Sequence, residues 1–410
     1  MAKAQTHYDV AILGAGAIGA ATACLLAQMA EKNAHSLKNA HSLKIALIES
    51  QLPTQFDATG FDPRVAAITE KTRGLLAQCG AWQQIQATRV SAYQSMQVWD
   101  AEGTGRISFD SSDVQQPNLG HIVENSVLVS ALMAQVERCA NIEVYCPASV
   151  AHYQMEADCL ALSLDNHRQI STNLLIAADG ANSAVRKHFQ FATKQWDYDQ
   201  QAIVTTITTE KPNQNTAWQR FMPTGPLALL PLNHEGDLHR CSIVWSQDTE
   251  QAERLMALSD EDFCQQLSRD SEHCLGTVLK IDKRHLIPLR QSHAIDYVMP
   301  RVALLGDAAH SIHPLAGQGA NLGFADAQVL IEELARAHER DLDLGELSVL
   351  KRYQRRRKPD NLATMAAMEG FKRLFGSPNS ALRLLRNYGM SGVDQIAPLK
   401  NTLIKKAMGL

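Results

Sequence analysis

The stretch from Tyr8 to Ala27 constrains the fold of this chain more than any other. It begins with a short apolar run of strand type, Tyr8–Leu13, and ends in a run of small and apolar residues that is typical of a helix. Between the two lies a turn with the spacing Gly-x-Gly-x-x-Gly. A strand, a glycine turn and a helix in this order predict a parallel α/β sheet that binds a dinucleotide.

Each glycine of this turn has its own expected role. Gly14 allows the tight turn, Gly16 lets the backbone approach a pyrophosphate, and Gly19 lets the helix pack closely. The helix N-terminus adds unpaired N–H groups and a partial positive charge for the phosphates. The second strand, Ile45–Ile48, ends at Glu49, which we expect to accept hydrogen bonds from ribose hydroxyls.

A tandem repeat lies between the first helix and the second strand. The six residues Asn33–Lys38 recur at once as Asn39–Lys44. A duplication at this place is interpreted as a tolerated loop insertion without a function of its own.

Two further stretches repeat the pattern of an apolar strand that ends in a polar turn. Leu174–Ala178 is followed by Asp179-Gly180 and, a few residues later, by Arg186. The strand after Arg301 ends at Gly306-Asp307, and Asp307 is placed to bind sugar-like hydroxyls. These turns predict two more contacts with the same nucleotide.

The segment after Asp307 is rich in glycine and leads into a helix that runs to about Arg336. The helix N-terminus near Gly319 is expected to stabilise negative charge on a bound ring system. His310 and His313 have no acidic or thiol partner at ligand spacing, so no metal site is expected.

Composition places the chain among ordinary globular proteins, with 45% hydrophobic and 20% charged residues. It has no run of about 18 apolar residues, so no transmembrane helix is expected, and the first strand lies so near the N-terminus that no signal peptide is expected either. Eight scattered cysteines without a C-x-x-C pair fit a reducing cytoplasm.

The charge is distributed unevenly along the chain. The 60 residues from Lys351 to Leu410 hold 13 Lys and Arg against 3 Asp and Glu, a net charge of +10. The first 350 residues hold 26 against 40, a net charge of −14. A basic segment of this kind suggests an acidic partner or an anionic membrane surface.

Alternating apolar residues between positions 194 and 290 predict an antiparallel sheet with one buried face. We therefore expect an α/β protein in which a Rossmann-like domain is interleaved with an antiparallel-sheet domain and followed by a helical segment. The predicted division assigns 1–75, 105–190 and 290–345 to the nucleotide domain. It assigns 76–104 and 191–289 to the substrate domain, and 346–410 to the basic helical segment.

Four motifs together carry a family resemblance. Leu119–Asn125, Ala178–Ser183, Gly306–His310 and Pro314–Gly323, with the glycine turn before them, resemble the single-component FAD-dependent aromatic hydroxylases. Their order and spacing agree over nearly the whole chain, and in detail they look most like the ubiquinone-biosynthesis hydroxylases. The resemblance implies a fold like that of para-hydroxybenzoate hydroxylase.

The resemblance also implies a reaction. NAD(P)H reduces FAD, the reduced flavin takes up O₂ to form a C4a-hydroperoxide, and the distal oxygen attacks the electron-rich ring of a polyprenylated phenol or quinol. Residues 216–232 and 399–410 look like the branch that acts on a demethoxy-quinol, and residues 120–125 like the branch that acts on a prenylphenol. The balance favours the demethoxy-quinol.

Site residues follow from the same resemblance, position by position. The expected FAD-binding residues are Gly14, Gly16, Gly19, Glu49, Arg64, Asn125, Asp179, Gly180, Arg186, Gly306, Asp307, Gly319, Ala320 and Asn321. The expected catalytic loop, which covers the flavin, consists of Pro314, Gly317, Gln318 and Gly319. A phenol activates its own ring, so no acid–base residue is assigned.

The implied partners are the prenylated substrate, O₂, NAD(P)H as co-substrate, and a quinone-biosynthesis assembly. The basic segment suggests contact with a membrane surface, so we expect a cytoplasmic protein on the inner membrane face that binds no nucleic acid. Alternatives are a non-catalytic FAD-bound scaffold and a hydroxylase of another aromatic substrate. The sequence has neither the cysteine pair of a thiol-dependent reductase nor the Trp-x-Trp signature of a halogenase.

Overall fold

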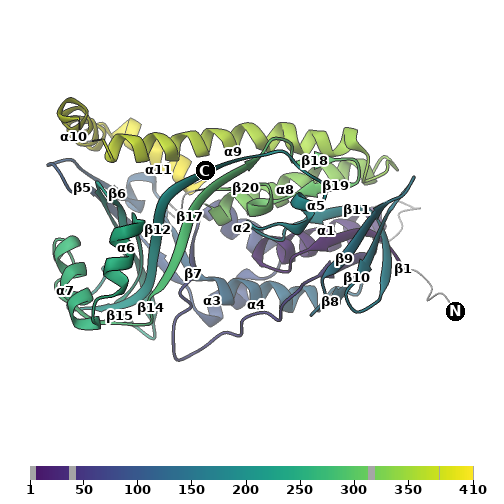
Figure 1. The fold of residues 1–410 in the computed structure, drawn as a ribbon, viewed down its shortest axis with the longest axis horizontal. Coiled ribbons are helices and arrows are strands. Elements are labelled where there is room, and N and C mark those ends of the chain that lie inside the picture. Colours follow the sequence, from purple (N-terminus) through teal and green to yellow (C-terminus); the bar gives the residue numbers. More distant parts are fainter. Residues whose placement is uncertain (1–5, 37–42, 313–318, 378, 410) are drawn as a thin grey trace.

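The fold combines a largely parallel sheet, a large and mostly antiparallel sheet and a C-terminal run of helices (Figure 1). A computed structural model describes residues 6–36, 43–312, 319–377 and 379–409. The α/β architecture expected from the sequence is thereby confirmed, including the helical C-terminal segment.

The first sheet has eight strands, with β1 at its centre between β11 and β2. Its strands are β1 (Thr6–Leu13), β2 (Ile45–Ile48), β8 (Ile142–Tyr145), β9 (Val150–Met155), β10 (Leu160–Leu164), β11 (Gln169–Ala177), β18 (Val298–Met299) and β19 (Val302–Leu304). The strands β19, β11, β1, β2 and β8 run parallel to one another. Consequently their carboxyl ends meet at one edge of the sheet.

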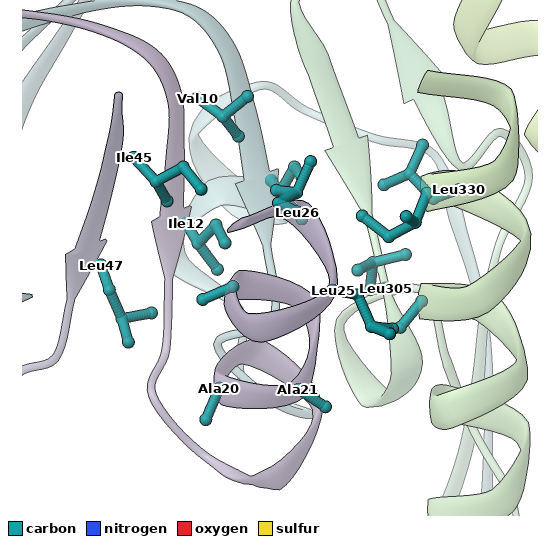
Figure 2. Packing of buried hydrophobic residues seen from close by; sticks show 14 of the residues in the cluster. Val10, Ile12, Ala20, Ala21, Leu25, Leu26, Ile45, Leu47, Leu305 and Leu330 are labelled. Atoms are coloured by element: carbon teal, nitrogen blue, oxygen red, sulfur yellow. The ribbon is translucent and has the colours of Figure 1, made fainter. Parts of the chain in front are cut away.

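Helix α1 (Ala17–Ser36) lies between this sheet and α8 (Gly319–His338), as Figure 2 shows. Leu26 faces Ile12 of the sheet, while Leu25 lies toward Leu305 and Leu330 on the other side (Figure 2). The small residues of α1, which are fully buried at Ala20 and Ala21, allow this close approach on both sides. A strand covered on both faces is apolar, which explains the continuous apolar run Val10–Leu13 in β1.

The second sheet has nine strands, most of which pair in antiparallel fashion. Its strands are β5 (Ser95–Asp100), β6 (Arg106–Asp110), β12 (Thr193–Thr209), β13 (Thr216–Met222), β14 (Gly225–His234), β15 (Asp237–Asp248), β16 (Val278–Ile281), β17 (His285–Ala294) and β20 (His310–Ser311). The antiparallel sheet that alternation predicts between residues 194 and 290 is thus confirmed. β20 joins this sheet directly after the Gly306-Asp307 turn of the first sheet.

The two faces of the nine-stranded sheet have different neighbours. Helices α6 (Thr249–Met256) and α7 (Asp260–Asp270) cover one face, where Ile203, Trp245 and Phe263 are fully buried. On the other face, Leu230 packs against a buried cluster that includes Ile122 of a three-stranded sheet. That sheet consists of β3 (Val65–Ile68), β7 (Gly120–Glu124) and β4 (Ser91–Tyr93).

The remaining elements link or cover these sheets. They are α2 (Glu70–Gln78), α3 (Trp82–Thr88), η1 (Ser111–Val114), α4 (Asn125–Val136), α5 (Ala184–His188), η2 (Gly306–Ala308), α9 (Leu347–Phe375), α10 (Ser380–Gln395) and α11 (Ala397–Met408). The long helix α9 runs along the molecule over both large sheets (Figure 1). Within the described part of the chain, no helix has the length and apolar character needed to cross a membrane.

The tandem repeat differs partly from its expected loop structure. Helix α1 continues through Ser36, so the first four residues of the first copy are helical. The end of the first copy and most of the second, residues 37–42, lie outside the described residues.

Candidate functional site

Four polar turns lie at the edge of the eight-stranded sheet where its parallel strands end. Gly14 follows β1, Glu49 follows β2, Asp179 comes shortly after β11, and Gly306 comes shortly after β19. Ligands of open α/β sheets bind outside the carboxyl ends of the strands. The parallel pairing therefore brings the three sequence stretches together at one site, as expected.

The glycine turn has the conformation that the sequence predicts. Gly14 has a φ of +95°, and a side chain there would also meet the Ala178 carbonyl oxygen at 2.4 Å. A Cβ atom at Gly19 would lie only 1.8 Å from the Gly14 carbonyl oxygen and 3.4 Å from the Ala178 Cβ. Helix, turn and the end of β11 are therefore in direct contact, and only glycine fits at either position.

Gly16 differs from Gly14 and Gly19 because the space that a side chain would take there is open. A Cβ atom there would have no protein atom within 4 Å. Beside it, the Glu49 carboxylate accepts a hydrogen bond from the Ala15 N–H at 2.7 Å and another from the Gln51 N–H at 3.0 Å. An open backbone next to a fixed carboxylate is the arrangement expected for a pyrophosphate and its ribose.

The Asp307 carboxylate lies between the buried residues Gly306 and Ala308, close to Arg186 and His310. The residue is solvent-exposed, yet protein atoms surround it closely enough that burial raises the pKa of its carboxyl, an effect that His310 and Arg186 partly offset. In the described structure the carboxylate accepts no hydrogen bond, so its oxygens are free for ligand hydroxyls.

Asp179 and Arg186 hold the site together through the protein itself. The Arg186 guanidinium donates to the carbonyl oxygens of Ala308, at 2.8 Å, and Ala181, at 2.5 Å, and burial lowers its pKa. The Asp179 carboxylate accepts from the Ala184 N–H at 2.7 Å and so caps α5. These bonds join the turn after β11 to the turn after β19, and direct contact of either residue with the cofactor stays a prediction.

A second group of predicted residues gathers around β3. The Asn321 side chain donates to the Ala67 carbonyl oxygen at 2.7 Å and accepts from the Thr72 hydroxyl at 2.8 Å. The Asn125 N–H donates to the Arg64 carbonyl oxygen at 2.9 Å, and the Arg64 side chain is exposed. Asn321, Arg64 and Asn125 thus border one region, next to the N-terminus of α8.

The predicted flavin-covering loop is only partly visible. Pro314, Gly317 and Gln318 lie outside the described residues. Gly319 is the first residue of α8, and Ala320 is half-buried beside it. Gly180 has a φ of +78° and open space on its side.

The sequence did not reveal two buried ion pairs that lie next to predicted site residues, one beside Gly306 and one beside Asn125. Asp326 of α8 is fully buried and binds Arg357 of α9 at 2.8 Å. Glu124 binds Arg89 at 2.6 Å and also accepts from the Asp62 N–H at 2.7 Å. The one signal in the sequence was Asp326 itself, because it is a charged residue on the apolar face of a predicted helix.

A dinucleotide fits the residues that are present. The open side of Gly16 leaves room for a pyrophosphate, and the unpaired Asp307 carboxylate offers acceptors for the hydroxyls of a sugar chain. The buried Asp179 Oδ1 also lacks a partner in the described structure. Residues from all three sequence stretches are thus available to one extended ligand.

Comparison with known families agrees with this geometry. A family model described as an FAD binding domain matches residues 7–367. The chain is 34% identical to the mouse protein "Ubiquinone biosynthesis monooxygenase COQ6, mitochondrial", an alignment that covers 98% of this chain and 91% of that protein. It is also 34% identical to "3-demethoxyubiquinol 3-hydroxylase" of Escherichia coli strain K12, and 98% of each chain is covered.

Solved structures show the same fold at much lower identity. The p-nitrophenol 4-monooxygenase PnpA from Pseudomonas putida superposes with a TM-score of 0.78 at 16% identity, and 98% of each chain is covered. PqsL, a probable FAD-dependent monooxygenase from Pseudomonas aeruginosa, gives a TM-score of 0.77 at 20% identity over 94% of this chain and 100% of that one.

Proposed function

The chain belongs to the FAD-binding family of flavoprotein monooxygenases, and from this premise we propose that it hydroxylates the aromatic ring of a polyprenylated phenol or quinol in ubiquinone biosynthesis. The similarity that carries the proposal extends over 98% of the chain to two curated relatives, one named for ubiquinone biosynthesis and the other for hydroxylation of demethoxyubiquinol. Among the possible ring substrates, a demethoxy-quinol is favoured.

The residues present assign a place to each part of the cofactor. Gly14, Gly16 and Gly19 with Glu49 are proposed to hold the ADP half, and Asp307 the ribityl chain. Asn321 and the Arg64–Asn125 corner would border the flavin ring, beside the N-terminus of α8. The partial positive charge of that helix end favours negative charge on the ring.

When bound, FAD supplies the oxygen-transfer chemistry, and the protein supplies position and exclusion of water. The face of the nine-stranded sheet that carries Leu230 packs toward β7, next to the Asn125 corner. A substrate ring bound between this sheet face and the flavin would be shielded from solvent. NAD(P)H is the proposed source of electrons, and the preference for NADH or NADPH is a matter for assay.

A peripheral membrane contact is proposed for the C-terminal segment, where a prenylated substrate would be reached in lipid. Exposed apolar side chains support this proposal better than the positive charge of the segment does. Seven large apolar side chains of this segment are exposed, namely Leu362, Phe371, Leu382, Tyr388, Ile396, Leu399 and Leu403. This surface would also suit a partner in a quinone-biosynthesis assembly, and we propose a cytoplasmic location for the protein.

We also propose the domain division expected from the sequence, with one refinement. Residues 106–110 form β6, which pairs with β5 in the nine-stranded sheet. Together with residue 105 they join residues 76–104 and 191–289 in the substrate domain, while 1–75, 111–190 and 290–345 form the FAD domain and 346–410 the basic helical segment.

The decisive experiment measures product mass. Purified protein loaded with FAD is incubated with NAD(P)H, ¹⁸O₂ and a panel of short-chain prenylphenols and demethoxy-quinols. Gain of one ¹⁸O atom on one member establishes the hydroxylase, and the position of the new hydroxyl identifies the branch. Asp307→Ala, assayed at the same total FAD, serves as the cofactor-deficient control.

The alternatives give different results in the same assay. Oxygen incorporation into an unprenylated phenol, with none into the prenylated panel, would identify a hydroxylase of another aromatic substrate. A scaffold would bind FAD but oxidise no NAD(P)H with any member, even when the assay includes membrane vesicles.

A further inference from the structure

We propose that Asp326 is the positioning residue of the cofactor site, because it fixes the turn that presents Asp307 to the ribityl hydroxyls of FAD. The inference rests on the proposed assignment of Asp307 to the cofactor. It concerns a residue that lies on α8, nineteen positions further along the chain, and that is itself inaccessible to ligand.

Asp326 binds the turn on both sides of Asp307. Its Oδ2 atom lies 3.2 Å from the Gly306 N and 2.6 Å from the His310 Nε2. Gly306 immediately precedes Asp307, and His310 follows it three positions later. One carboxylate oxygen thus anchors both ends of the short segment from which Asp307 projects.

The other oxygen of Asp326 is held by α9. Its Oδ1 accepts a hydrogen bond from Arg357 Nε at 2.8 Å and another from Asn361 Nδ2 at 3.1 Å. Arg357 Nη2 in turn donates to Asn361 Oδ1 at 2.7 Å. Four donors therefore satisfy the buried carboxylate, which leaves it little freedom to move relative to α8, α9 or the turn.

The Asp326 carboxylate is ionised in these surroundings. Burial alone would raise its pKa, but His310 and Arg357 together keep the pKa below its ordinary value. A charged acceptor forms stronger hydrogen bonds than a neutral one, so the Gly306 N–H and the His310 ring are firmly held.

The network leaves Asp307 as the free member of the turn. Arg186 takes the carbonyl oxygens of Asp307 and Ala308, and Asp326 takes Gly306 and His310. The Asp307 carboxylate keeps its oxygens for a ligand. Loss of Asp326 would release both ends of the turn, and Asp307 would then reach the ribityl chain only at an entropic cost.

The test is a double-mutant cycle in FAD affinity, measured by the change of flavin fluorescence on binding to the apoprotein. We expect Asp326→Ala and Asp307→Ala each to raise the Kd for FAD by on the order of tenfold to a hundredfold, the range for lost hydrogen bonds to charged groups. The double variant should bind about as weakly as Asp307→Ala alone, because Asp326 acts through Asp307. Asp326→Asn, which keeps one acceptor oxygen, should retain more affinity than Asp326→Ala.

Asp100 provides a matched control. It is as deeply buried as Asp326 and is likewise held by an arginine, an asparagine and a backbone N–H, namely Arg386, Asn387 and Glu102. It lies at the end of β5, which Figure 1 shows well apart from β19 and therefore from the Gly306–His310 turn that follows β19. We expect Asp100→Asn to lower the apoprotein Tm as Asp326→Asn does, and to leave the FAD Kd within about twofold of wild type.

The outcomes separate this inference from the proposed function. An unchanged Kd in Asp307→Ala would refute the cofactor assignment itself. If Asp307→Ala does raise the Kd, either of two results would overturn the positioning role. One is a double variant in which the two effects multiply. The other is an Asp100→Asn variant that loses as much FAD affinity as Asp326→Asn does. If Asp326→Ala does not fold, His310→Asn removes one anchor only and should still raise the Kd severalfold; an unchanged Kd there would refute the proposal.

Discussion

Apolar side chains hold the region around β1 and α1 together, whereas the C-terminal segment is attached to the rest of the protein by buried ion pairs as well as by apolar contacts. In the first region Val10, Ile12 and Leu26 are fully buried among other apolar side chains (Figure 2). In the second, Arg386 of α10 is buried against Asp100 of β5 at 2.7 Å, and Arg357 of α9 against Asp326 at 2.8 Å.

The difference explains the uneven charge of the chain. At least five of the thirteen cations after residue 350 pair with acids that precede it. The pairs are Arg356 with Glu332 and Glu333, Arg357 with Asp326, Arg383 with Glu102, Arg386 with Asp100, and Lys400 with Asp113. Much of the net charge of +10 is therefore complementary to the net charge of −14 within the same molecule.

This pairing changes the interpretation of the segment as a docking surface. A charge that is neutralised inside the protein attracts an anionic membrane weakly. The exposed apolar side chains of the segment support a membrane or protein contact better than its net charge does. We accordingly expect such a contact to depend little on salt.

The largest expected effect tests the close packing of the first region. Gly19→Ala would place a Cβ atom 1.8 Å from the Gly14 carbonyl oxygen, so helix and turn must separate. We expect the free energy of unfolding of the apoprotein to fall by more than about 4 kcal/mol, which is exceptional for one substitution. Thermal denaturation of the apoprotein measures this.

Gly16→Ala is the matched control for that prediction, since its Cβ would meet no protein atom within 4 Å. The apoprotein Tm should change by no more than about 1–2 °C, while the FAD Kd rises because the methyl group occupies the space next to the pyrophosphate. An apoprotein that loses as much stability with Gly16→Ala as with Gly19→Ala would contradict the structure of the turn.

The next prediction tests the ion pairs of the second region. Arg386→Met leaves the Asp100 carboxylate buried without its cation, and we expect a loss of about 3–5 kcal/mol in unfolding free energy. Chemical denaturation measures this loss. Asp100→Leu combined with Arg386→Met should recover most of it, because an apolar pair can replace a buried ion pair.

A comparison with Leu26→Ala sharpens this result. That substitution leaves a cavity in the apolar core and is expected to cost about 2–5 kcal/mol, a similar amount. A second substitution that removes a charged partner cannot recover this loss, because the loss comes from a cavity and not from an unpaired charge. If the Asp100→Leu and Arg386→Met costs instead simply add, the pair does not act as a unit and the contrast between the two regions fails.

The sequence predicted the first region well because its signals are local. The strand, the glycine spacing and Glu49 at the end of β2 lie within one βαβ unit, where neighbouring residues determine the conformation. The polar turns at Asp179 and Asp307 could be placed with them because parallel strands end at one edge.

The ion pairs of the C-terminal segment could not be predicted in this way, and neither could the hydrogen bonds by which Asp326 holds the Gly306–His310 turn. Arg386 and Asp100 are 286 residues apart, and no local pattern joins an arginine in one helix to an acid at the end of a distant strand. Composition gives the positive charge of the segment, but it does not say whether the charged side chains face solvent or the protein. Asp326 is one of several polar residues of α8, and only its place on the apolar face of the predicted helix distinguishes it from those on the exposed face.

A smaller effect is expected at Asp307, where cofactor binding and stability oppose each other. Burial raises the pKa of this carboxyl, so the ionised form destabilises the folded apoprotein at pH 7. Asp307→Asn should therefore raise the apoprotein Tm while it weakens FAD binding. The gain should be complete above the raised pKa, should shrink as the pH falls, and should vanish below the ordinary value of about 3.9, where wild type is protonated in both states. A lower Tm at pH 7 would show that the carboxylate stabilises the turn instead.

The smallest effect is expected for an ion pair on the surface of the same segment. Arg373 binds Glu369 at 2.6 Å one turn away on α9, but the arginine side chain is 80% exposed. Water and salt screen such a pair, so Arg373→Ala should change the unfolding free energy by no more than about 0.5 kcal/mol. Chemical denaturation at low salt and at about 1 M salt measures it, and the high-salt difference should approach zero. A loss comparable with that of Arg386→Met would mean that burial does not distinguish the ion pairs of this segment. The ionic part of the attachment of α9–α11 would then depend on the number of ion pairs rather than on the few pairs that are buried.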